Sequence, residues 1–216
     1  MEIEIVVPDS LKEITLEQYQ RFLKIQANNE DETFLAIKMI EIFCKVRGDV
    51  IMKMKASDIR DITGILAEMF NQKPPLVKHF DMKGIKYGFI PKLEDMTFGE
   101  YVDLDTYISD IENIHKAMAV LYRPVTTQYN ELYSIEEYDG ENYNKMKDMP
   151  MHAVLSSIIF FYNLGMDLSK AMLDYLHQEG DKDIVQRITS VKDGDGTNQF
   201  THSLKEILED LKISLN

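Results

Sequence analysis

The chain contains few of the residues that cross-link or punctuate small extracellular folds. Among its 216 residues there is one cysteine, Cys44, with no tryptophan, six prolines and ten glycines. A lone cysteine cannot form an internal disulfide, and a chain of this length buries about 70% of its unfolded surface without such a link. The sequence therefore indicates either a reducing compartment or indifference to redox conditions, and a fold that depends on its apolar core.

Basic residues are also scarce. The chain carries 24 Lys and Arg against 37 Asp and Glu, which gives a net charge of −13 and a pI near 4.8. Affinity for nucleic acid comes from a basic face that neutralises phosphates, and anionic lipid attracts basic segments. We therefore expect neither sequence-specific nucleic acid nor a membrane as a partner.

One apolar stretch, residues 149–166, has about the length of a short membrane span. It contains Pro150, His152 and Asn163, which favour a helix buried in a protein core over one surrounded by lipid. The first ten residues, MEIEIVVPDS, alternate acidic and apolar side chains and lack the basic start of a signal peptide. The expectation is a protein in solution inside the cell that makes it.

Apolar residues recur at helical spacing along most of the chain, and two helix starts carry a specific signal. The tetrapeptides TLEQ (15–18) and TFGE (97–100) both fit the capping box, in which two side chains satisfy backbone N–H groups reciprocally. Further amphipathic helices are predicted over about residues 30–46, 57–70, 107–122, 150–165 and from 203 onward.

Extended structure is expected in three places only. Residues Ile3–Val7 alternate like a short N-terminal strand, and residues 76–91 read as a β-hairpin insertion that turns near Lys83-Gly84. Residues 123–143 are predicted to form an extended, tyrosine-rich arm. The sequence thus predicts one mostly α domain over residues 1–216: a single compact helical domain with a small β-hairpin insertion and a short N-terminal strand.

The patterns that usually carry catalysis are weak. Glu112 and His115 form Glu-x-x-His, but a di-iron helical bundle needs two such pairs and two further glutamates. Cys44 lies on an apolar helix face, where burial makes a thiol inert. Ser156 lacks the glycine-framed elbow of a hydrolase nucleophile. We therefore expect no enzyme activity, no catalytic residue and no cofactor or metal, and keep a small helical metalloenzyme using Glu112 and His115 as an alternative.

Tyrosines gather around the predicted arm. Tyrosine offers a large contact area with a polar tip, which suits protein interfaces. The arm is open to two interpretations, an exposed docking surface or a segment packed across its own domain. The candidate partner-binding residues are Tyr122, Arg123, Tyr129, Tyr133 and Tyr138.

Four blocks between about residues 80 and 176 occur in a distinctive order. They are GIKYGFIPKLEDMTFGEYVDLDTYI (84–108), AMAVLYRPVT (117–126), YSIEEYDGE (133–141) and MPMHAVLSSIIFFYNLG (149–165). In these blocks and their order the chain resembles small virion or tail-region proteins of tailed bacteriophages, including crAss-like phages that infect gut Bacteroidetes. None of the blocks is a catalytic signature.

The resemblance implies a non-enzymatic bacteriophage virion protein of the tail or portal region, made in the host cytoplasm. It would be a ring component below the portal, or a cargo protein packed in the tail and released on infection. The partners expected are other phage tail or portal-region proteins, with a homo-oligomer left open. A net negative charge suits contact with a DNA channel, because it repels the passing phosphates. A tail-assembly chaperone that is absent from the mature virion is the alternative.

Overall fold

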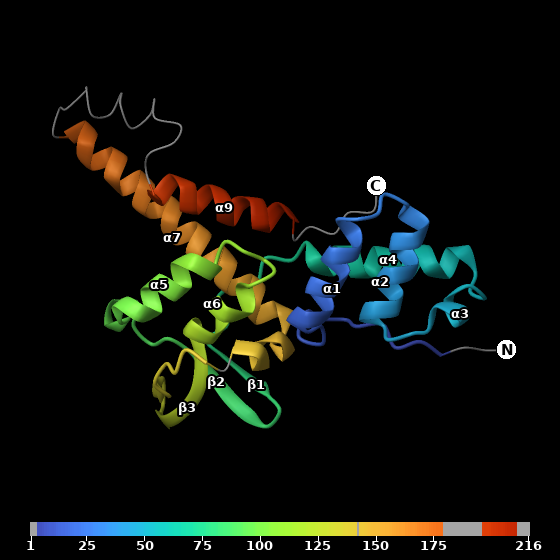
Figure 1. Ribbon diagram of the computed structural model, residues 1–216, viewed down its shortest axis with the longest axis horizontal. Helices are drawn as coiled ribbons and strands as arrows, with labels where there is room; N and C mark the ends of the chain where they lie inside the picture. The colour runs from blue at the N-terminus through green and yellow to red at the C-terminus, as the bar shows by residue number, and fades with distance from the viewer. Residues whose placement is uncertain (1–3, 142, 179–195, 211–216) are drawn as a thin grey trace.

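The computed structural model describes residues 4–141, 143–178 and 196–210. Figure 1 shows α1, α2, α3 and α4 gathered toward one end of the molecule, and the sheet with α5 and α6 beside them. The helices are α1 (Leu16–Gln26), α2 (Glu32–Phe43), α3 (Gly48–Ile51), α4 (Ala56–Phe70), α5 (Phe98–Tyr107), α6 (Ile114–Leu121), α7 (Met151–Gln178) and α9 (Gly196–Asp210). The strands are β1 (His79–Met82), β2 (Ile85–Phe89), β3 (Tyr122–Tyr129) and β4 (Leu132–Ile135), and η1 (Leu93–Asp95) and η2 (Tyr143–Asp148) are 3-10 turns.

The prediction of a mostly α domain with only a small hairpin is wrong, because the architecture is mixed α/β. Within the described residues, four strands form one antiparallel sheet in the order β1-β2-β3-β4. The β1–β2 hairpin turns at Lys83 and Gly84, both with positive φ. It is joined to β3 through pairs such as Phe89 with Tyr122. This pairing spans more than thirty residues and two intervening helices, so local sequence patterns do not reveal it.

The segment expected to be an extended arm supplies the second half of this sheet. Its residues form most of β3 and all of β4, which pair as an antiparallel hairpin with an irregularity between Val125 and Thr127. Asn130, with φ of 52°, occupies the tight turn between them. The extended segment satisfies its backbone hydrogen bonds by pairing with β2 and with itself, so it packs as part of the sheet.

The short N-terminal strand is also a wrong prediction. Ile3 lies outside the described residues, and residues 4–7 run without a strand partner in the part of the chain that the structure describes. Side chains in this segment do alternate between solvent and core, since Val6 is exposed and Val7 packs against the core. Alternating side chains alone do not make a strand when no sheet edge lies within reach.

Two predicted helix starts are confirmed and two are wrong, because α6 begins later and α9 earlier, at Gly196, than the sequence predicts. Both capping boxes are confirmed, at Thr15 for α1 and at Thr97 for α5. The helix expected from residue 107 begins only at Ile114, because Asp110 Oδ1 accepts the backbone N–H of Glu112 and forms a turn. Helix α7 continues through Gly165, its predicted end, and α9 packs along it (Figure 1).

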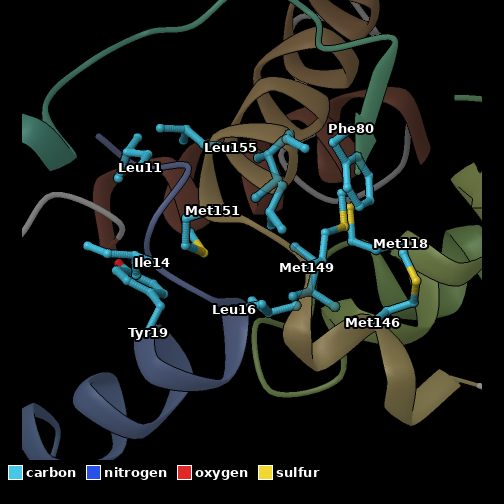
Figure 2. Packing of buried hydrophobic residues seen from close by; sticks show 14 of the residues in the cluster. Leu11, Ile14, Leu16, Tyr19, Phe80, Met118, Met146, Met149, Met151 and Leu155 are labelled. Carbon is cyan, nitrogen blue, oxygen red and sulfur yellow. The ribbon is translucent and has the colours of Figure 1, made fainter. Parts of the chain in front are cut away.

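The start of α7 connects the N-terminal helices to the sheet. The backbone N–H of Leu16 donates to Met149 O at 2.9 Å, and the N–H of Met151 donates to Ile14 O at 2.8 Å. Figure 2 shows these residues side by side in the core, with Met118 nearby. All five are at most 1% exposed. Met118, Met149 and Met151 have flexible side chains, which fill the irregular space between α1, α6 and the start of α7.

Helix α7 contains a segment, Met151–Leu168, that is long and apolar enough to cross a membrane. Half of this segment is buried inside the protein, and a core helix meets the same criterion. The buried half includes Val154 and Ile158, both fully enclosed. The apolar residues of this segment therefore contribute to the core of the protein.

Candidate interaction site

The five residues predicted to bind a partner all lie on or beside the β3–β4 hairpin, but four of them make internal contacts. Tyr122, at the start of β3, is 1% exposed. Its hydroxyl donates to Val77 O at 2.7 Å and lies 2.9 Å from Ser157 Oγ on α7. Burial raises the pKa of Tyr122 to about 12. This tyrosine joins the sheet to α7 and faces away from solvent.

Arg123 forms a buried ion pair with Glu100 of α5. Arg123 Nη1 lies 2.7 Å from Glu100 Oε1, and the two side chains are only 12% and 6% exposed. The other carboxylate oxygen, Oε2, accepts the backbone N–H and the hydroxyl of Thr97 at 2.7 and 2.8 Å. One carboxylate therefore closes the capping box of α5 and fastens that helix to β3.

Tyr133 of β4 lies across the sheet and reaches β2. Its hydroxyl donates to Phe89 O at 2.6 Å, and its ring meets the ring of His79 edge-on with centroids 4.3 Å apart. The ring covers Gly88 so closely that a Cβ built there would lie 2.7 Å from Tyr133 Cε2. Glycine at position 88 thus makes room for the tyrosine that holds β4 down.

Tyr138, in the loop after β4, is tied to α5 as well. Its hydroxyl donates to Asp103 Oδ2 at 2.6 Å and lies 3.5 Å from the hydroxyl of Tyr143. Burial, followed by these hydrogen bonds, raises the pKa of Tyr138 far above its usual value. The hairpin and the loop after it are therefore fixed to the domain by Arg123, Tyr133 and Tyr138.

Tyr129 is the predicted residue that remains free to meet a partner. It pairs with Leu132 across the turn, and these side chains are 78% and 76% exposed. We call Tyr129 and Leu132 the hairpin tip. Exposed Tyr and Leu side chains next to each other provide contact area that the domain itself does not use.

A second exposed apolar group lies on α5 and was missed from the sequence. Phe98 is 82% exposed, Tyr101 55% and Val102 42%. These three residues, which we call the α5 stripe, lie at positions i, i+3 and i+4 and share a helix face. The opposite face of α5 carries Glu100 and Leu104, which are buried. The helical spacing of these residues was visible in the sequence. However, α5 has apolar residues on both faces, so the sequence did not show which face is exposed.

Glu112 and His115 do not share a site. The Glu112 carboxylate is exposed and lies 3.7 Å from Lys24 Nζ, whereas His115 is buried in α6. Burial lowers the pKa of His115. No group of three or more His, Cys, Asp or Glu side chains converges as metal ligands within the described residues. Burial likewise raises the pKa of the Cys44 thiol to about 11, which keeps it protonated at neutral pH.

The N-terminal helices enclose an apolar groove of about 750 Å³ between α2, α3 and α4. We call it the α2–α4 groove. Small side chains, a glycine and two methionines are among its lining residues. The lining residues are Glu32, Thr33, Ala36, Ile37, Ile51, Met52, Met54, Ala56, Ile59, Arg60, Thr63, Gly64 and Ala67.

Comparison with known proteins gives no relative from which a role could be transferred. No family model matches the chain, and no curated protein and no solved structure is similar to it.

Proposed function

We propose that this protein is a non-enzymatic component of a tailed-bacteriophage particle, located in the tail or portal region as a ring component or as packed cargo. It binds other phage tail or portal-region proteins through the hairpin tip. The observation that carries the proposal is the exposed pair Tyr129 and Leu132 at the end of a hairpin that is fastened to the domain by internal contacts.

The fastening matters because it lowers the entropic cost of binding. Arg123 fastens the hairpin at the start of β3, and Tyr133 fastens it beside the tip. Little chain freedom is therefore lost when the tip docks. Tyrosine is among the residues that carry most of the binding energy at protein interfaces. A rigid strand pair with an aromatic tip is therefore better suited to recognition than a loose arm of the same composition.

The acidic residues around the hairpin tip indicate the chemistry of the surface that would bind it. Glu131 stands in the turn, and Glu136 and Glu137 follow β4. An apolar pocket with a basic rim complements a tyrosine and a leucine surrounded by carboxylates. The virion assignment itself is supported by the resemblance of the sequence blocks, two of which (84–108 and 117–126) include β2, α5 and the start of β3.

The experiment is quantitative mass spectrometry of purified virions of the phage that encodes the chain. The proposal predicts the protein at a defined copy number per particle. A tail-assembly chaperone would instead be abundant in infected cells and missing from finished virions. Repeated absence from virions would overturn the proposal.

A pair of variants tests the hairpin tip within the same assay. The double variant Tyr129→Ala/Leu132→Ala should keep the melting temperature of the wild type, because both side chains are largely exposed, and should be lost from virions. Val6→Ala is the matched control, since Val6 is 76% exposed and lies outside the hairpin. Normal incorporation of the tip variant would show that partners bind elsewhere.

A further inference from the structure

Two apolar surfaces lie toward opposite ends of the longest axis of the molecule. In Figure 1, α5 lies on one side of the sheet, whereas α2, α3 and α4 form the far end. One surface is convex, the α5 stripe, and the other is concave, the α2–α4 groove. Surfaces of complementary shape at different places on one molecule allow head-to-tail association of identical chains.

The α5 stripe is a helix face that nothing in the described chain covers. Its side chains Phe98, Tyr101 and Val102 are each more than 40% exposed, and Asp105 continues the same face one turn later. The other side of α5 is held by the ion pair of Glu100 with Arg123. The stripe is thus a preformed ridge of helical spacing, the form in which helices enter apolar grooves.

The α2–α4 groove has the dimensions and lining of a helix-binding site. Its volume of about 750 Å³ falls within the range of specific pockets. Ala36, Gly64 and Ala67 lie along it, and no described atom lies within 4 Å of a Cβ built on Gly64. Small residues let another backbone approach closely, and Met52 and Met54 can adapt to side chains such as phenylalanine and tyrosine.

Charge complementarity selects a second copy of the chain as the occupant. Residues 93–115, which include α5, contain seven acidic residues and no Lys or Arg. Residues 45–60, which lead through α3 into α4, contain five basic and two acidic residues in a chain of net charge −13. Lys53, Lys55 and Arg60 are exposed and form no ion pair within the described ranges. Arg60 lines the groove, and Lys53 and Lys55 are chain neighbours of its lining residues Met52, Met54 and Ala56. These basic side chains complement the acidic surroundings of the stripe.

We propose that the α5 stripe of one copy binds the α2–α4 groove of a second copy, head to tail. Such a contact uses different surfaces on the two copies, so it closes into a ring or continues as a filament. A ring component would need a contact of this kind, but the inference rests on the two surfaces and does not require the virion assignment.

The test uses the full chain in sedimentation velocity at about 100 μM, where an interface with micromolar Kd is largely occupied. Wild type should sediment as oligomers. The stripe variant Phe98→Ala/Tyr101→Ala and the groove variant Gly64→Leu should sediment as monomers, with Kd weakened at least about tenfold. Gly64→Ala is the matched control, because one methyl group leaves most of the groove open.

Mixing the two variants distinguishes head-to-tail contact from any symmetric one. The stripe variant keeps an intact groove, and the groove variant keeps an intact stripe. Their equimolar mixture should therefore form dimers and nothing larger. Circular dichroism should show unchanged folding in both, since Phe98 and Tyr101 are exposed and a larger residue at Gly64 meets open space.

Three results would each overturn the proposal: a monomeric wild type at this concentration, oligomers that persist in both variants, or a mixture that stays monomeric. Binding of a different virion protein by the stripe in place of self-association would also overturn it. The hairpin-tip variant should self-associate normally. A chain that self-associates but is absent from virions would refute the proposed function and leave this inference standing.

Discussion

Arg123→Ala should destabilise the domain far more than the loss of an ordinary surface ion pair. The substitution leaves the Glu100 side chain, which is 6% exposed, without its 2.7 Å partner. Breaking a buried pair by removing one partner costs about 3–5 kcal/mol. The capping interactions of Glu100 with Thr97 remain, so the carboxylate keeps part of its hydrogen bonding. We therefore expect about 3 kcal/mol, the lower end of that range.

The assay is urea unfolding at pH 7 followed by circular dichroism, with the change in midpoint converted through the denaturant slope. The matched control is Lys83→Ala, which removes the pair between Lys83 Nζ and Asp148 Oδ2. Those side chains are 73% and 37% exposed, so the control should lose much less stability than Arg123→Ala. Equal losses in the two variants would refute the reasoning that Arg123 holds β3 to α5.

Two further predictions concern the sheet and the start of α7. Gly88→Ala places a methyl group 2.7 Å from Tyr133 Cε2. The free energy of unfolding in urea should therefore fall by about 1–3 kcal/mol. An unchanged free energy would mean that the Tyr133 ring is not fixed over Gly88. Burial, and secondly the charge of Lys12, lower the pKa of His152 from 6.5 to about 4. The unfolded chain therefore binds more protons in this window, so stability present above pH 6.5 should fall as pH drops toward 4. His152→Gln should reduce that fall in melting temperature, and an unchanged pH profile would contradict the assignment.

The starts of α1 and α5 were predictable from the sequence because their signals are local. The capping boxes at Thr15 and Thr97 depend on side chains three residues apart, and both are present. The sheet was not predictable in the same way, since the pairing of Phe89 with Tyr122 depends on how the chain between them folds. The same dependence explains Gly165, where packing against α9 continues α7 beyond its expected end.

The candidate site shows the same division between local and tertiary information. The cluster of tyrosines was visible in the sequence, but their roles differ according to which polar groups lie within reach. Tyr133 finds a carbonyl on β2 for its hydroxyl, whereas Tyr129, four residues earlier on the same hairpin, is 78% exposed. The sequence shows which tyrosines are available for an interface. Which of them are exposed depends on how the strands pair in the sheet.

We propose that this molecule acts by docking through its exposed hairpin tip within a phage particle. The most direct measurement is the copy number per virion of the wild type and of Tyr129→Ala/Leu132→Ala, each supplied in trans to a phage that lacks the gene. The account predicts a fixed number of copies for the wild type and almost none for the variant at equal expression. Equal numbers for both, or none for either, would contradict it.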